Sequence, residues 1–224
     1  MPSSLADVRL VIFDIDGTLL ATDSFWLDIG RRAVTTVYGR HGVRRALPED
    51  ERFVGAIGLP MEEFWRYVLP EDLHRLGEEV EREAEDLEEV AFGKGLGAMY
   101  PGARRLLDDL HHAGRAVALA SNCSRRYLDS FVRAFALGPI LLAARCADDP
   151  GVASKADMVS QILDAAEAPP AVVVGDRDTD REAARANRLP FVLFAGGFSS
   201  TARSDGDIVA RDFSELRRLL LGPA

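Results

Sequence analysis

The chain has 224 residues, which is enough for one large domain or two modest ones at about 100 to 200 residues per domain. With 47% apolar and 28% charged residues it lies in the globular range, which excludes a disordered or collagen-like protein. The 36 acidic residues outnumber the 27 basic ones and give a net charge of −9. No overall positive field therefore attracts a polyanion, and we expect no nucleic-acid partner.

The cysteines and the apolar stretches bear on where the protein works. Cys123 and Cys146 form no CxxC motif, no histidine cluster has zinc-site spacing, and we interpret both cysteines as reduced thiols. No stretch approaches the roughly 18 consecutive apolar residues of a membrane span, and no basic region precedes the first apolar run. We therefore expect a cytoplasmic protein without a membrane partner.

Apolar, β-branched runs alternate with segments of helical periodicity over most of the chain. Several of these runs lack polar alternation, which is typical of buried parallel strands. The alternation predicts an α/β fold, a Rossmann-like doubly wound parallel sheet, whose ligands bind beyond the carboxyl ends of the strands. The predicted strands are Val8–Ile15, Ala116–Ala120, Ile140–Ala144, Val172–Val174 and Phe191–Phe194, and helices are predicted at about 101–113, 124–135, 155–167 and 179–187.

Residues 21–97 break this rhythm, because they contain helical patterns at about 24–38, 61–68 and 71–91 but no strand. We therefore predict a core domain of residues 1–20 and 98–224 with an inserted helical domain of residues 21–97. The acidic run at 71–89 holds ten acids and two arginines, and we interpret it as a solvated helix face. The glycines at 93–97 predict a hinge; a nucleotide-binding loop is disfavoured, because Ala98 stands where GxGxxG needs glycine.

The first cluster of polar residues is Asp14-Ile15-Asp16-Gly17-Thr18-Leu19, directly after an apolar strand. In an extended segment residues two apart point to the same side, so Asp14 and Asp16 would face one cavity. Two carboxylates held this close repel each other, which raises a pKa or demands a cation. An Asx turn that ends a strand is the purely structural alternative.

The second cluster is Gly175-Asp176-Arg177-Asp178-Thr179-Asp180, again after a continuous apolar run. One or two of these aspartates would serve as helix caps, but three beside another pair exceed what capping needs. A parallel sheet would bring both clusters together in an all-oxygen site suited to Mg²⁺. Asp178 would either tune that metal or cap the helix, and both interpretations stay open.

Ser121 and Asn122 follow another strand and precede a helix, an arrangement that suits a phosphate at a helix N-terminus. Taken alone, the pair is better interpreted as an ordinary N-cap. Lys155 is one of only two lysines beside 25 arginines, and it stands where a helix dipole disfavours a cation. A role beside carboxylates and phosphate would explain it, whereas a solvated lysine is the alternative.

These four features, in this order, resemble the four motifs of the haloacid dehalogenase-like hydrolase superfamily, and most closely its phosphoglycolate phosphatase-like enzymes. The helical insert is similar to the cap domain of that superfamily. The resemblance implies an enzyme, a Mg²⁺-dependent phosphatase that hydrolyses a small phosphorylated metabolite, such as phosphoglycolate or a sugar phosphate. An acid/base aspartate at Asp16 is associated with phosphatases and mutases, which disfavours dehalogenation.

The resemblance also implies roles for particular residues. Asp14 would be the nucleophile that forms an aspartyl-phosphate, and Asp16 the general acid and then the general base. Substrate would be held by Thr18, Ser121, Asn122 and Lys155. The metal ligands would be Asp14, the backbone carbonyl of Asp16, Asp176 and Asp180.

Two alternatives to a phosphatase stay open at this stage. A phosphosugar mutase of the β-phosphoglucomutase type has the same motifs, and the access of water decides between the two reactions. A non-enzymatic phospho-ligand sensor is disfavoured, because it has no need of Asp14, Asp16 and Lys155 together. Substrate choice would come from the insert, where candidates for stacking or charge are Phe25, Trp26, Arg44, Arg45 and Trp65, the aromatic ones being better interpreted as core. Cys123 is interpreted as packing at a helix start rather than as a reactive thiol.

Overall fold

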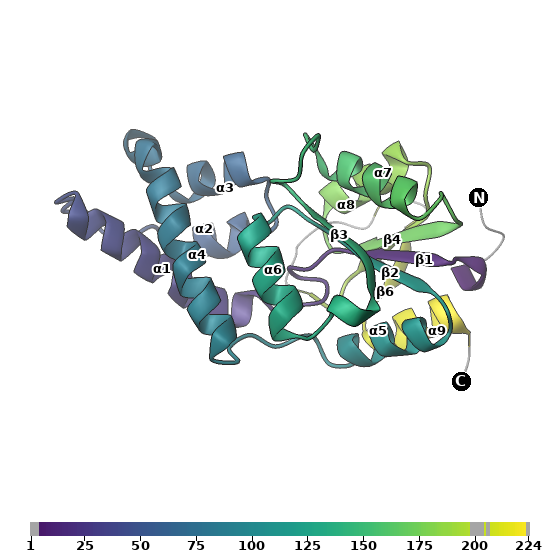
Figure 1. Ribbon diagram of the computed structural model, residues 1–224. Coiled ribbons are helices and arrows are strands. Elements are labelled where there is room, and N and C mark those ends of the chain that lie inside the picture. The colour runs from purple at the N-terminus through teal and green to yellow at the C-terminus, as the bar shows by residue number, and fades with distance from the viewer. Residues whose placement is uncertain (1–4, 198–203, 205–206, 223–224) are drawn as a thin grey trace.

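The computed structural model describes residues 5–197, 204 and 207–222. Within them, six parallel strands form one sheet in the order β3-β2-β1-β4-β5-β6 (Figure 1). The direction of winding changes between β1 and β4, and ligands bind at such a switch point in open α/β sheets. The predicted Rossmann-like doubly wound fold is confirmed. The strands are β1 (Leu10–Phe13), β2 (Ala116–Ser121), β3 (Leu141–Cys146), β4 (Ala171–Gly175), β5 (Phe191–Phe194) and β6 (Ile208–Ala210).

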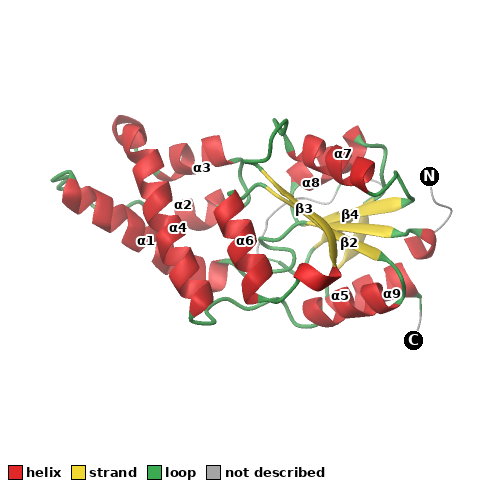
Figure 2. Cartoon of the chain, in the orientation of Figure 1, coloured by secondary structure: helices red, strands yellow, loops and turns green. Residues whose placement is uncertain are grey.

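Helices cover both faces of the sheet, because each central strand is apolar on both sides (Figure 2). Val11 and Phe13 belong to the core that α5, α6 and α9 close, whereas Leu10 and Ile12 belong to the core beneath α7 and α8. Among the described residues, no helix combines the length and apolarity needed to cross a membrane. The helices of the core are α5 (Ala103–His112), α6 (Arg125–Ala134), α7 (Lys155–Ala165), α8 (Asp178–Ala186) and α9 (Phe213–Leu221), with 3₁₀ turns η1 (Leu5–Asp7) and η3 (Gly138–Ile140).

The predicted helical insert is a group of helices at the end of the sheet to which the carboxyl ends of the strands point (Figure 1). It has an apolar cluster of its own, which includes Val34, Phe53 and Val80. Its last helix, α4, also packs against α6 of the core. The insert consists of α1 (Asp23–Arg40), α2 (Asp50–Ala56), α3 (Met61–Val68), the 3₁₀ turn η2 (Glu71–Leu76) and α4 (Gly77–Gly93).

The two connections between insert and core run side by side. The amide of Ala21 donates to the carbonyl of Ala98 at 3.0 Å, and the amide of Tyr100 donates to Leu19 at 2.9 Å. Helix α4 ends at Gly93, and Gly95 and Gly97 follow with φ of +71° and +89°, a region that favours glycine. The predicted hinge therefore lies at a true connection, and its motion stays a prediction.

Some elements differ from the prediction, chiefly because they are short or start irregularly. The predicted helix at 71–91 is split into η2 and α4 where Gly77 follows Leu76. The predicted strand at 8–15 is shortened to β1, because the carbonyl of Ile15 already accepts turn hydrogen bonds from Thr18 and the residues that follow. Helix α2, strand β6 and helix α9 were not predicted; β6 has only three residues and α2 seven, too few for a periodic signal.

Candidate active site

Three carboxylates meet at the switch point of the sheet. Asp14 follows β1 and Asp176 follows β4, and these strands pair with Phe13 opposite Val174. Asp180 lies in the first turn of α8. Each of the three offers a carboxylate oxygen within 4.8 Å of the others, and all three side chains are buried. The structure thus brings the two aspartate clusters of the sequence together.

Lys155 lies among these carboxylates. Its Nζ donates to Asp14 Oδ1 and to Asp180 Oδ1, each at 2.6 Å, and the residue is only 6% exposed. Burial lowers the pKa of Lys155, but the two carboxylates outweigh burial, and the pKa is held above its ordinary value. A solvated lysine is therefore excluded, and the ammonium offsets part of the negative charge at this site.

One oxygen of the cluster is left without a partner. Asp176 Oδ2 is buried and accepts no hydrogen bond from the described residues. Burial, together with Asp14 and Asp180, raises the pKa of Asp176 to about 8. Gly17, at φ +85°, leaves this oxygen room, because a Cβ there would lie 2.3 Å from it. An unsatisfied carboxylate oxygen in an all-oxygen cluster fits a hard divalent cation such as Mg²⁺.

The hydroxyl of Thr18 packs against the same cluster. Its Oγ1 lies 3.3 Å from Asp14 Oδ2 and 3.4 Å from Asp176 Oδ1, and the residue is fully buried. A single hydroxyl proton serves one of these oxygens at a time. Contact between Thr18 and a substrate stays a prediction.

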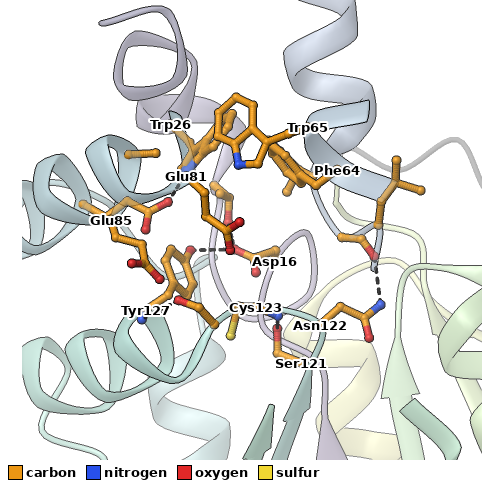
Figure 3. Close-up of a pocket in the computed structure, with 17 residues that line it drawn as sticks. Asp16, Trp26, Phe64, Trp65, Glu81, Glu85, Ser121, Asn122, Cys123 and Tyr127 are labelled. Atoms are coloured by element: carbon orange, nitrogen blue, oxygen red, sulfur yellow. Dashed lines mark hydrogen bonds between the residues drawn. The ribbon is translucent and has the colours of Figure 1, made fainter. Parts of the chain in front are cut away.

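Asp16 is held apart from this cluster and reaches a cavity (Figure 3). Its Oδ1 accepts hydrogen bonds from Thr22 Oγ1 and from Tyr127 Oη, both at 2.6 Å. Burial and the charge of Asp14 raise the pKa of Asp16 to about 6, although both hydroxyls act to lower it. A carboxyl group with such a pKa suits proton transfer near neutral pH.

Ser121 and Asn122 lie at the carboxyl end of β2, beside β1. The N-cap of α6 is Ser124, whose side chain accepts from the amide of Tyr127, so the interpretation of Ser121-Asn122 as that cap is wrong. Asn122 instead reaches the insert, where its Nδ2 donates to the carbonyl of Gly58 at 3.0 Å. Ser121 is left at the end of β2, next to β1, the strand that Asp14 follows.

A cavity of about 70 Å³ lies between insert and core (Figure 3). The core contributes Asp16, Ser121 and Asn122 to its lining, and Asp14 follows the neighbouring strand. The insert contributes side chains of α1, α3 and α4, among them Trp26, Phe64, Trp65, Glu81, Glu85 and Glu88. The insert therefore covers the proposed catalytic residues and supplies the far wall of the cavity.

The acidic run of residues 71–89 was interpreted as a solvated face, and this is wrong for part of it. Glu78 and Glu89 are exposed, but Glu81, Glu85 and Glu88 line the cavity. These three are spaced by four and three residues and so share one helix face. Their position between Val80, Ala84 and Leu87 on the apolar side was the available signal.

The other insert residues that were predicted to set specificity divide into two groups. Trp26 and Trp65 belong to the apolar cluster of the insert, as predicted, and also line the cavity. Arg44 and Arg45 do not line it; both are exposed, and Arg45 pairs with Asp72. Phe25 packs on Phe92 instead. Of the insert residues predicted to set specificity, only the two tryptophans therefore line the cavity.

The structure shows where Asp178 and the two cysteines lie. Asp178 has 64% of its side chain exposed and pairs with Arg181, so it belongs to the first turn of α8 and not to the carboxylate cluster. Burial raises the pKa of the Cys123 thiol well above its ordinary value, so it stays protonated and packs at the start of α6. Cys146 is likewise a free thiol.

Glu88 makes the stability of the protein depend on pH. The residue is 7% exposed, and burial, with Asp16 and the neighbouring glutamates, raises its pKa from 4.5 to about 8, although Trp26 Nε1 donates to its Oε1 at 2.5 Å. The folded state therefore binds a proton that the unfolded state has lost between about pH 4.5 and 8. Across this window the stability contributed by Glu88 falls as the pH rises.

We expect Glu88→Gln to be more stable than the wild type at pH 8 and equal to it near pH 5. Gln keeps the acceptor for Trp26 but carries no charge. At roughly 2–4 °C per kcal/mol for a chain of this size, the melting temperature at pH 8 should rise by about 3 °C or more. Thermal unfolding at both pH values measures this, with the exposed Glu78→Gln as control. If the melting temperatures of Glu88→Gln and the wild type changed with pH in the same way, this expectation would be contradicted.

A buried carboxylate cluster with an ammonium thus lies at the switch point of a Rossmann-like sheet, beneath a helical insert. The sequence profile of the haloacid dehalogenase-like hydrolases matches residues 11–185. The chain therefore belongs to the haloacid dehalogenase-like hydrolase family, as the four motifs indicated. No curated protein matches the chain.

Solved structures share the whole fold at low sequence identity. A proposed phosphoglycolate phosphatase from Lactobacillus plantarum has a TM-score of 0.78 at 18% identity, covering 95% of this chain and 99% of that one. CbbY from Rhodobacter sphaeroides in complex with phosphate has a TM-score of 0.73 at 22% identity, covering 93% and 96%. A CbbY mutant in complex with xylulose-1,5-bisphosphate has a TM-score of 0.71 at 21% identity, covering 93% of this chain and 96% of that one. At these identities the likeness shows the fold.

Proposed function

We propose that the protein is a Mg²⁺-dependent phosphatase, which hydrolyses a small phosphomonoester through an aspartyl-phosphate on Asp14. The observation that carries the proposal is the contact of Lys155 Nζ with Asp14 and Asp180 inside a buried carboxylate cluster. Residues 21–97 would act as a cap over this site. The phosphate and phosphorylated sugar in the CbbY structures support a phosphorylated substrate.

In the first step, a carboxylate oxygen of Asp14 attacks phosphorus and the ester P–O bond breaks. The leaving alkoxide takes the proton of Asp16. Both hydroxyl donors to Asp16 reach the same oxygen, Oδ1, so Oδ2 is available to carry that proton toward the substrate. Ser121 and Lys155 would hold the oxygens of the phosphoryl group, and Asn122 would orient the substrate.

In the second step, water attacks phosphorus, its proton passes to the Asp16 carboxylate, and the bond between phosphorus and Asp14 breaks. Inorganic phosphate leaves, and Asp14 and Asp16 return to their starting states. The pKa of about 6 for Asp16 lets one side chain act as acid and then as base near neutral pH.

Asp14, Asp176, the backbone carbonyl of Asp16 and, as support, Asp180 would hold the metal. When bound, Mg²⁺ would offset the repulsion between an anionic nucleophile and an anionic phosphate and stabilise charge in the transition state. The unsatisfied Asp176 Oδ2 supports this assignment.

A phosphosugar mutase is the second candidate, and the cavity gives it less support. A mutase returns the phosphoryl group to a second hydroxyl, and the reaction passes through a sugar bisphosphate. While one phosphate of this intermediate lies at Asp14, the other needs a cation on the opposite wall of the cavity. The lining of the cavity contains no lysine, arginine or histidine. A sensor without catalysis has no use for the raised pKa of Asp16. Both alternatives are outcomes of the experiments below.

The test is phosphate release from p-nitrophenyl phosphate and a panel of small phosphomonoesters, with Mg²⁺ and with a chelator. We expect release only with Mg²⁺, and a loss of about 100-fold or more in kcat/KM for Asp176→Asn, because that variant removes a metal ligand. Asp178→Asn, two residues away and exposed, is the matched control and should retain activity. Equal rates with Mg²⁺ and with chelator would overturn the proposal.

A further inference from the structure

The far wall of the cavity is anionic. The residues that line the cavity include the carboxylates Asp16, Glu81, Glu85 and Glu88 and no basic side chain. Asp16 belongs to the proposed reaction, so three carboxylates have no part in it. All three come from the same face of α4 and line the cavity on the insert side (Figure 3 labels Glu81 and Glu85).

These carboxylates lack adequate counter-charges within the described part of the chain. Glu81 forms no ion pair there, and the nearest cation to Glu85 is Arg126, whose Nη1 lies 4.0 Å from Oε2. Glu88 is 7% exposed, lines the cavity and accepts a hydrogen bond from Trp26 at Oε1, and no cation pairs with it among the described residues. Acidic side chains without a close cation at the wall of a partly enclosed cavity suit a ligand that donates hydrogen bonds or carries positive charge.

Aromatic rings stand beside the carboxylates. Trp26, Phe64 and Trp65 line the same cavity, and their ring centroids lie 5.0 to 6.1 Å from one another. Tryptophan and phenylalanine faces attract cations, by about 2 kcal/mol or more when water is excluded. The cavity volume of about 70 Å³ corresponds to about five water molecules, which suits a short chain rather than a sugar ring.

We propose that this cavity selects phosphomonoesters whose leaving alcohol carries an ammonium group, that is, phosphorylated short amino alcohols. This inference rests on the proposed phosphatase function: the phosphate would lie at Asp14, Ser121 and Lys155, of which Ser121 lines the cavity. The ammonium would lie at Glu81, Glu85 and Glu88. The same wall repels a second anion, and so disfavours phosphoglycolate and sugar bisphosphates. The phosphate of such a substrate would meet Lys155 and the metal, and its ammonium group would meet the glutamates of α4.

The energetics of the empty cavity agree with this assignment. Burial and the neighbouring acids Glu85, Asp148 and Glu78 raise the pKa of Glu81 to about 7, and Glu88 has a pKa of about 8. Without a cation beside them, Glu81 and Glu88 therefore keep their protons to higher pH than ordinary glutamates. An ammonium group would supply that cation and favour the ionised carboxylates.

The experiment compares three small esters of similar length that differ in the charge of the leaving group. O-Phosphorylethanolamine ends in an ammonium, propyl phosphate in a methyl group, and phosphoglycolate in a carboxylate; glycerol 3-phosphate tests hydroxyl donors. We expect kcat/KM with Mg²⁺ to be about 10- to 100-fold higher for O-phosphorylethanolamine than for propyl phosphate, and lowest for phosphoglycolate.

Variants test whether the carboxylates cause this preference. Glu81→Gln should lower the ratio of kcat/KM for the ammonium ester over propyl phosphate by about tenfold, because it removes one unpaired charge. A general loss of active protein lowers both kcat/KM values by the same factor and so leaves their ratio unchanged. Glu78→Gln, on the same helix but exposed, makes the same charge change and should leave the ratio as it is. An unchanged ratio in Glu81→Gln would overturn the assignment of this wall.

The two proposals fail in different ways. If p-nitrophenyl phosphate is hydrolysed but propyl phosphate, glycerol 3-phosphate or phosphoglycolate is preferred to the ammonium ester, the inference is wrong and the phosphatase stands. If no ester is hydrolysed, calorimetry with Mg²⁺ decides the inference. Binding of O-phosphorylethanolamine at least about tenfold tighter than propyl phosphate would support the ammonium site in a sensor, and equal binding would overturn it.

Discussion

Asp14→Asn should abolish phosphate release, lowering kcat by about 10⁴-fold or more with every phosphomonoester. An amide has the same shape as the carboxylate but is a poor nucleophile toward phosphorus. Its oxygen can still accept the hydrogen bond from Lys155, so the variant should fold. Phosphate release under saturating substrate and Mg²⁺ measures the loss of activity, and the thermal unfolding curve shows whether the variant folds.

Asp164→Asn is the control for Asp14→Asn. It lies on the exposed side of α7, makes the same charge change and should keep full activity. If Asp14→Asn keeps more than about a tenth of the wild-type kcat, then Asp14 is not the nucleophile, and water attacks the ester directly.

Lys155→Met should lower both stability and activity. Removing one partner of a buried ion pair leaves the others uncompensated and costs about 3–5 kcal/mol. Asp14 and Asp180 would then face Asp176 without the ammonium. We expect the melting temperature in chelator to fall by about 10 °C, less in Mg²⁺, and kcat to fall by about 10³-fold.

Lys94 is the natural control, because it is the only other lysine in the sequence and is exposed in the connection between insert and core. Lys94→Met should change the melting temperature by less than about 2 °C. The account of the site would be contradicted if Lys155→Met melted like Lys94→Met in chelator, since the carboxylates would then need no ammonium.

The sequence sufficed to predict the α/β core and the meeting of the carboxylates. Strands buried on both faces read as continuous apolar runs, and parallel strands bring their carboxyl ends to one edge of the sheet. The aspartates after β1 and β4 therefore had to approach each other. Lys155 stood out by composition alone, as one lysine among many arginines. The two carboxylates at 2.6 Å from its Nζ explain why a lysine stands at this position.

The far wall of the cavity was beyond the sequence, because it depends on how the insert docks on the core. Glu81 and Glu88 lie in a run of acids that resembles any solvated helix face. Their position beside Val80, Ala84 and Leu87 was the one signal in the sequence, and the packing of α4 against α6 and α1 shows that these acids face the cavity. Tyr127 was missed for the same reason: it precedes Leu128 in an ordinary amphipathic helix, and its hydrogen bond to Asp16 spans 111 residues of sequence.

Trapping the covalent intermediate tests the central claim most directly. The protein is mixed with Mg²⁺ and a substrate that it hydrolyses, quenched in acid during turnover, digested and mapped by mass spectrometry. The account predicts the added mass of one phosphoryl group on the peptide that contains Asp14, lost after hydroxylamine treatment and absent from Asp14→Asn. Phosphate release without this mass, or the mass on Ser121 instead, would contradict it.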